Sequence, residues 1–158
     1  EMTRFLIERG RRNIAFLGVS HPDEQRFRGY RAALEEAGIL FRPELAVRCG
    51  DTMTGGYEFM RDLLAVHPDG IFTHNDEIAI GALRAAEEEG VPVPGRLSIG
   101  GFDNIETGRY LRPALTTVDQ PREAITRALM DELLASMNDP AHHRTVSIPC
   151  RLVIRESV

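Results

Sequence analysis

Residues 70–104, GIFTHNDEIAIGALRAAEEEGVPVPGRLSIGGFDN, decide the fold of this chain, because they read twice as an apolar strand that ends in a polar corner. Asn75 and Asp76 form the first corner, and their short side chains accept the free N–H groups of a helix start. Apolar residues at helical spacing follow until a glycine stops the helix. A second short strand then ends at Asp103 and Asn104. The stretch therefore predicts a strand–helix–strand unit.

The same alternation extends over the rest of the chain. Short apolar runs at residues 13–18 and 45–49 predict two further strands, and amphipathic stretches at residues 24–37 and 55–66 predict the helices that follow them. Strands that alternate with helices build parallel sheets, because a parallel crossover needs a long connection, usually a helix. The predicted fold class is therefore α/β, a doubly wound parallel sheet with helices on both faces.

The composition excludes several classes of protein. Apolar residues make up 42% and charged residues 27% of the 158 residues, which is typical of a globular domain with one core. A net charge of −5 argues against this segment gripping nucleic-acid phosphates by itself. No apolar run reaches the roughly 20 residues that a membrane helix needs, and no secretory signal is evident, so a cytoplasmic protein without membrane contact is expected. Cys49 and Cys150 are too few for a disulfide scaffold or a zinc site.

Polar side chains at the predicted strand ends form the candidate ligand site. In an open parallel sheet, ligands sit in the crevice at the carboxyl ends of the strands. Asn75 and Asp103 follow two successive strands, and Gln120 opens a later helix over residues 121–138. Arg26 stands in the first helical turn after the first strand, where a cation opposes the helix dipole. The ordinary alternative is that these groups are only turn residues, helix caps and a surface arginine.

No catalytic constellation is evident in the sequence. The chain has no G-x-S-x-G, H-E-x-x-H or C-x-x-C motif. His74 and Asp76 could serve as a base and its orienting acid, but neighbours on a turn more often point apart. Asp76 and Asp103 offer too few oxygen ligands for a divalent cation, so neither a metal nor a cofactor is expected. The polar groups suit a small polyhydroxylated or heterocyclic ligand that is held without being changed, so the chain is not expected to be an enzyme.

Five segments carry a resemblance to a known family. They are GRRNIAFLG (10–18), RFRGYRAALEEAG (26–38), HNDEIAIGALRAAEEEGVPVPGRLSIGGFDN (74–104), RPALTTVDQP (112–121) and a closing strand with RES (155–157). In this order and spacing the chain resembles the LacI/GalR family of bacterial transcriptional regulators over nearly its whole length. The resemblance implies the family's effector-binding module, whose fold is similar to type I periplasmic sugar-binding proteins. In that fold two α/β lobes are joined by three chain crossings and hold a small ligand between them.

The resemblance also implies a division into lobes. Residues 13–117 and 144–156 would form the C-terminal lobe, whereas residues 1–10 and 121–138 would contribute helices to the N-terminal lobe. The first residues read as the middle of an amphipathic helix, so residues 1–158 are expected to be a fragment of the effector-binding domain. Operator DNA would be bound by an N-terminal helix-turn-helix domain that this segment lacks.

The family's ligand contacts map onto specific positions of this chain. The resemblance implies ligand contacts for Arg26, Asn75, Asp103 and Gln120. Thr52 is a further candidate, because it stands where family members often place an aromatic residue that stacks on the ligand. Because Thr52 replaces that aromatic residue on the ligand side, the resemblance does not identify the effector. A sugar and a nucleoside-like or purine-like metabolite are both compatible with the sequence.

The family pairs two C-terminal lobes into a homodimer. Ile80, Leu83, Tyr110 and Leu111 fall where that contact would lie. Ile80 stands off the apolar stripe of its helix, which favours an interface. The alternative is that these side chains belong to the core of a single chain.

The function that the sequence favours is the effector-sensing and dimerisation part of a LacI-type transcriptional regulator. The first alternative is a periplasmic sugar-binding protein of a transporter, which has the same fold and crevice. A helix-turn-helix or a signal peptide upstream of Glu1 would distinguish the two. The second alternative is an α/β enzyme, which turnover of sugars or nucleosides would reveal.

Overall fold

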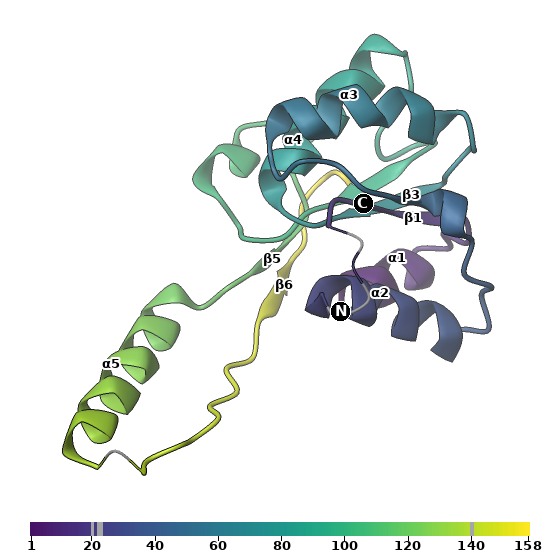
Figure 1. The fold of residues 1–158 in the computed structure, drawn as a ribbon. Helices are drawn as coiled ribbons and strands as arrows, with labels where there is room; N and C mark the ends of the chain where they lie inside the picture. Colours follow the sequence, from purple (N-terminus) through teal and green to yellow (C-terminus); the bar gives the residue numbers. More distant parts are fainter. Residues whose placement is uncertain (20, 22–23, 140) are drawn as a thin grey trace.

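A four-stranded parallel sheet lies at the centre of the structure, a computed structural model that describes residues 1–19, 21, 24–139 and 141–158 (Figure 1). The strand order is β2-β1-β3-β4. The strands are β1 (Ile14–Leu17), β2 (Ala46–Val47), β3 (Gly70–Thr73) and β4 (Ser98–Gly100). All neighbouring strands pair in parallel, so their carboxyl ends face one edge of the sheet.

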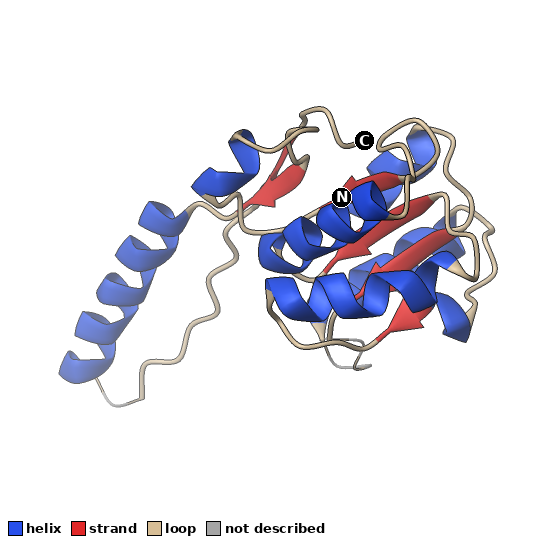
Figure 2. Ribbon diagram, turned by 90° about the horizontal axis from the view of Figure 1, so that it is seen from above, coloured by secondary structure: helices blue, strands red, loops and turns tan. Residues whose placement is uncertain are grey.

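Helices cover both faces of this sheet. α1 (Met2–Glu8) and α2 (Gln25–Glu36) lie on one face, and α3 (Met53–Leu64) and α4 (Asp76–Glu88) lie on the other, as Figures 1 and 2 show. Every residue of β1, β3 and β4 is buried, which is why these strands read as continuous apolar or small-residue runs. The predicted α/β, doubly wound fold is confirmed. Two 3-10 turns, η1 (Pro43–Leu45) and η2 (Glu106–Arg109), complete the main body.

Two glycines bring α3 and α4 into backbone contact. A Cβ on Gly81 would lie 1.9 Å from the carbonyl oxygen of Met53, and a Cβ on Gly56 would lie 2.1 Å from that of Ile78. Only glycine permits such an approach. The contact holds the starts of both helices together, and with them the polar loops that precede each helix.

An aromatic cluster fills the core between the sheet and α2. The fully buried ring of Phe16 lies 5.3 Å from Phe27, 5.6 Å from Tyr30 and 5.5 Å from Phe72, measured between ring centroids. The Tyr30 hydroxyl donates to the carbonyl oxygen of Ile14 at 2.9 Å. Burial raises the pKa of Tyr30, so this hydroxyl stays protonated and keeps its donor role.

The placement of α1 differs from the expectation that residues 1–10 belong to a second lobe. Met2 and Leu6 are buried in the same core as Phe16, and a Cβ on Gly100 of β4 would lie 2.3 Å from the Met2 sulfur. The apolar side of this short helix packs on the same face of the sheet as α2 and shares its core. α1 is therefore part of the layer of helices that covers this face of the sheet.

The remaining elements leave the main body. β5 (Thr117–Asp119) and β6 (Arg151–Val153) form an antiparallel ribbon that leads to α5 (Arg122–Asn138), which projects away from the sheet (Figure 1). α5 has no buried residue, and its apolar side is exposed to solvent in the described part of the chain. Across the described residues, none of the helices has the length and apolarity needed to cross a bilayer.

Candidate ligand site

Three of the predicted ligand residues converge at the carboxyl edge of the sheet. Arg26 lies in the first turn of α2, Asp103 follows β4, and Gln120 follows β5. One Arg26 nitrogen, Nη2, is 3.9 Å from Asp103 Oδ1, and the Gln120 amide donates a short hydrogen bond to the same oxygen. The Arg26 guanidinium also lies over the Phe102 ring, 4.1 Å from its centroid. A cation, a carboxylate and an amide therefore meet at one place.

The other two predicted residues, Asn75 and Thr52, serve as helix caps. Asn75 Oδ1 accepts the backbone N–H of Ile78 at 2.8 Å, and Thr52 Oγ1 accepts that of Gly55 at 3.1 Å. Asn75 Nδ2 donates to the Asp51 carbonyl oxygen at 3.3 Å and so joins the two loops. Both side chains therefore act as helix caps, which was the alternative to ligand binding considered from the sequence. Their contacts with a ligand stay a prediction.

The backbone at Asp103 is held in an uncommon conformation. Asp103 has φ 115° and Asn104 has φ 52°, although neither is glycine. Non-glycine residues in such regions cost about 1–3 kcal/mol each and persist where their surroundings enforce them. Here the Asp103 N–H donates to the Val118 carbonyl oxygen at 2.9 Å, and the Asn104 N–H donates to Thr117 Oγ1 at 3.4 Å. The contacts with β5 aim the Asp103 carboxylate at Arg26 and Gln120.

A buried carboxylate, Asp76, stabilises the turn at Asp103 through hydrogen bonds to residues on both sides of it. Its two oxygens accept the Thr117 hydroxyl at 2.6 Å and the Ile105 N–H at 2.9 Å, and its own N–H donates to the Phe102 carbonyl oxygen at 2.8 Å. Asp76 is fully buried, and this burial raises the pKa of its carboxyl. A Cβ on Gly101 would lie 2.1 Å from Asp76 Oδ1, so glycine is needed there. Asp76 therefore links the start of α4 to the loop that carries Asp103.

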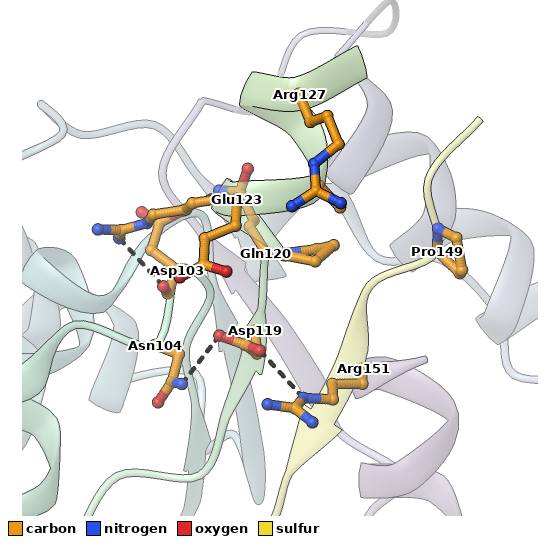
Figure 3. Close-up of a pocket in the computed structure, with 11 residues that line it drawn as sticks. Asp103, Asn104, Asp119, Gln120, Glu123, Arg127, Pro149 and Arg151 are labelled. Atoms are coloured by element: carbon orange, nitrogen blue, oxygen red, sulfur yellow. Dashed lines mark hydrogen bonds and ion pairs between the residues drawn. The ribbon is translucent and has the colours of Figure 1, made fainter. Parts of the chain in front are cut away.

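A hollow of about 650 Å³ lies beside these residues, between the Asp103 loop, the start of α5 and β6 (Figure 3). This volume is within the usual range of ligand pockets. Asp119 stands in its wall between Asn104 Nδ2, at 2.9 Å, and Arg151 Nε, at 3.0 Å (Figure 3). The hydrogen bond from Asn104 and the cation of Arg151 hold the pKa of Asp119 below its usual range, so the acid stays ionised. The wall of the hollow therefore contains both anionic side chains, Asp103 and Asp119, and a cationic one, Arg151.

Asn104 was expected beside Asp103 at this edge of the sheet, whereas Asp119 and Arg151 were not predicted as parts of this wall. Asp119 and Arg151 are opposite each other in the antiparallel pair of β5 and β6. Their opposite charges are the only signal in the sequence, and it is weak because strand register is not visible there. Among the described residues, no group of His, Cys, Asp and Glu is placed to hold a metal ion.

The four predicted interface residues have different environments. Leu83 is buried in the core, and Leu111 packs against that core while remaining partly exposed. Ile80 is partly exposed on α4, and Tyr110 is 74% exposed. Tyr110 and Ile80 therefore contribute to the exposed surface, whereas Leu83 acts chiefly within the chain.

Comparisons with known proteins agree with this architecture. The family model of the periplasmic binding protein-like domain matches residues 3–158. A relative in Yersinia pestis bv. Antiqua (strain Antiqua), described as the HTH-type transcriptional repressor PurR, is 36% identical over 164 residues, which cover 98% of this chain and 47% of that protein. A second one, from Yersinia enterocolitica serotype O:8, is equally similar. The chain therefore spans about half the length of the curated relatives it matches.

Solved structures of similar regulators superpose closely on the chain. A LacI-family transcriptional regulator from Enterococcus faecium with bound ribose has a TM-score of 0.87 at 30% identity, covering 99% of this chain and 60% of that one. A complex of the transcriptional regulator CelR with cellobiose has a TM-score of 0.90 at 29% identity, covering 99% and 50%. The chain belongs to the periplasmic binding protein-like domain family, in the form that builds the effector-binding module of LacI/GalR transcriptional regulators.

Proposed function

We propose that this chain is the effector-sensing part of a LacI-type regulator, which binds a small metabolite between two lobes and thereby changes operator affinity. The observation that carries the proposal is that Asp103 and Gln120 line the hollow while Arg26 approaches the same Asp103 oxygen, with Asp103 held in a costly backbone conformation. An effector that binds one arrangement of the lobes better than the other shifts the regulator toward that arrangement. The ligand is held and released unchanged.

The proposed second lobe would cover α5. Leu133, Leu134 and Met137 are each more than half exposed on this helix, which is unusual for a stable globular unit. Residues 13–117 and 144–156, joined by α1, would form one lobe, and residues 121–138 would pack in the other. The cytoplasmic location and the binding of operator DNA by an N-terminal helix-turn-helix domain are parts of the same proposal.

A sugar is the effector class that we favour over a nucleoside-like or purine-like metabolite. Carboxylates such as Asp103 and Asp119 accept hydrogen bonds from hydroxyl groups, and Arg26 donates to them. The ribose and cellobiose in two similar regulators support this choice. A periplasmic sugar-binding protein remains the alternative, and the match to HTH-type repressors favours the regulator.

Replacing Asp103 by Ala is expected to weaken effector binding at least about tenfold, because the partner groups lose a charged acceptor. Isothermal calorimetry of the full-length regulator, with ribose, cellobiose and purine nucleosides as probes, measures this loss. Asp62→Ala on the outer side of α3 removes an exposed carboxylate of the same kind and serves as the control. Unchanged affinity in Asp103→Ala would reject the assignment, and turnover of any probe would favour an enzyme.

The proposed homodimer contact is tested at Ile80. Ile80→Asp places a charge at the centre of the proposed interface and is expected to leave a folded monomer, because a desolvated unpaired charge strongly opposes association. Sedimentation velocity reports the oligomeric state, and circular dichroism reports the fold. A dimer of unaltered stability would show that the chains pair elsewhere.

A further inference from the structure

His74 directly follows β3 and is held tightly at the carboxyl edge of the sheet. Its N–H donates to the Leu17 carbonyl oxygen at 2.9 Å, which continues the pairing of β3 with β1. A Cβ on Gly18 would lie 2.3 Å from the His74 Cβ, so the missing side chain of Gly18 provides the space that His74 occupies. The His74 side chain is only 13% exposed. The ring is therefore fixed between the loops that follow β1 and β2.

Three charged side chains of the described residues contact this ring. Arg26 Nη1 lies 2.9 Å from Nε2 and 3.3 Å from Nδ1. Asp51 Oδ1, from the loop before α3, lies 3.1 Å from Nδ1. Glu24 Oε1, at the start of α2, lies 3.4 Å from Nε2, while its other oxygen accepts the Phe27 N–H at 2.6 Å and caps the helix.

The shorter contacts favour one tautomer of the neutral ring. A guanidinium only donates hydrogen bonds and a carboxylate only accepts them. In the shorter pair of contacts, Nε2 accepts from Arg26 at 2.9 Å and Nδ1 donates its proton to Asp51 at 3.1 Å. The opposite tautomer would use the longer pair, in which Nδ1 accepts from Arg26 at 3.3 Å and Nε2–H donates to Glu24 at 3.4 Å.

The guanidinium of Arg26 is thereby oriented from three sides. Its face lies over Phe102, Nη1 meets His74, and Nη2 points toward Asp103 at 3.9 Å. We propose that neutral His74 is the residue that positions Arg26 for the effector, and that protonation of the ring releases Arg26. This inference rests on the proposed function, because Arg26 is there a ligand contact.

Protonation changes the partners of the ring. An imidazolium has two donors and no acceptor, so Nε2–H turns to the Glu24 carboxylate while Nδ1–H stays with Asp51. Arg26 then loses its acceptor and faces a like charge, with Asp103 as the remaining anion on its other side. Arg26 is therefore held at the ring when the ring is neutral and is repelled from it when the ring is charged. The charged groups that surround the ring in the described residues are Glu24, Arg26, Asp51 and Asp103.

The first test reads the tautomer directly in the 158-residue chain. Long-range proton–nitrogen correlation spectra distinguish protonated from unprotonated ring nitrogens. We expect a proton on Nδ1 and none on Nε2 in the neutral ring, and we expect the Arg26 side-chain signals to move as the ring takes up its second proton. A proton on Nε2 of the neutral ring, or Arg26 signals that ignore ring protonation, would overturn the inference.

Two substitutions separate the contacts of the ring. In His74→Gln the side-chain amide reaches the position of Nε2 and offers Arg26 an acceptor, whereas in His74→Asn it reaches only the position of Nδ1 and serves Asp51. Ordered Arg26 signals should persist in His74→Gln and disappear in His74→Asn, with the fold of each variant checked by circular dichroism. Ordered Arg26 signals in His74→Asn would contradict the positioning role, and the tautomer test stands even if that variant does not fold.

The same pair gives a functional readout with D-ribose as the probe in the full-length regulator. Acidification through the protonation of His74 is expected to weaken ribose binding about tenfold in the unsubstituted protein, because Arg26 is left misplaced. His74→Gln should bind ribose with little dependence on pH over the same range. An equal pH dependence in both proteins would refute the role of His74. If ribose does not bind at all, ribose is excluded as the effector, and the ring tautomer still decides the inference about His74.

Discussion

Asp76→Ala is expected to lower the free energy of unfolding by about 2–4 kcal/mol, because it leaves one buried and one partly buried donor without an acceptor. These donors are the Thr117 hydroxyl and the Ile105 N–H, which Asp76 now accepts at 2.6 and 2.9 Å. The substitution also removes a buried charge whose solvation is unfavourable, as the raised pKa of Asp76 indicates. The loss of both hydrogen bonds is the larger effect, since an unsatisfied buried group such as the Thr117 hydroxyl costs about 1–3 kcal/mol and the partly buried Ile105 N–H adds to that cost. Urea denaturation of the 158-residue chain measures the change.

Asp76→Asn provides the matched control. The Asn oxygen can still accept from Ile105, and its amide can donate to Thr117 Oγ1, so the expected loss is smaller than in Asp76→Ala. The two proteins also differ in pH dependence. Because burial raises the pKa of Asp76, the folded state binds the proton more tightly than the unfolded chain, so the stability of the unsubstituted protein relative to Asp76→Asn rises as the pH falls through that pKa. Equal stability of all three proteins would show that Asp76 does not support the Asp103 turn.

Phe16→Ala is expected to destabilise the chain by about 3–5 kcal/mol, because it opens a cavity at the centre of a packed core. Phe16 is fully buried and contacts the rings of Phe27, Tyr30 and Phe72. These neighbours belong to α2 and β3, so the surrounding structure has little freedom to collapse into the space. Denaturant unfolding followed by circular dichroism reports the loss.

Leu133→Ala in α5 is the contrasting substitution. Leu133 is 52% exposed and belongs to a helix with no buried residue, so its removal should change the free energy of unfolding of this chain by less than about 0.5 kcal/mol. Comparable losses for Phe16→Ala and Leu133→Ala would mean that α5 contributes to the folded core of the isolated chain. If Leu133→Ala lowers the free energy of unfolding only in the full-length regulator, the result would support packing of α5 in a second lobe.

Much of the site could be predicted from the sequence because its residues stand at the ends of predictable strands. Asp103 follows β4 and Arg26 opens α2, so a parallel sheet necessarily brings both to one edge. Asn75 was predicted by the same reasoning, yet its side chain is used as the cap of α4. In this fold the end of a strand is followed closely by the start of a helix. Short polar residues such as Asn at that place can cap the helix or bind a ligand, and the sequence pattern does not distinguish the two roles.

Other features depend on contacts between segments that are far apart in the chain. The positive φ of Asp103, the buried Asp76 and the pairing of Asp119 with Arg151 all involve β5 or β6. Their register is set by the packing of the whole lobe, and it leaves little trace in local patterns. The packing of α1 against the sheet likewise depends on distant contacts, since the pattern of an amphipathic helix does not identify the surface on which it packs.

By itself the sequence determined the α/β alternation, the parallel sheet and the presence of Arg26 and Asp103 at the edge where a ligand site is proposed. These follow from hydrophobic periodicity, glycine stops and capping residues, which act over a few neighbouring residues. Only the tertiary structure decided that His74 orients toward Arg26, that Asp76 supports the Asp103 turn and that α1 covers the sheet. Those arrangements arise from hydrogen bonds and packing across distant segments, whose geometry exists only once the sheet has formed.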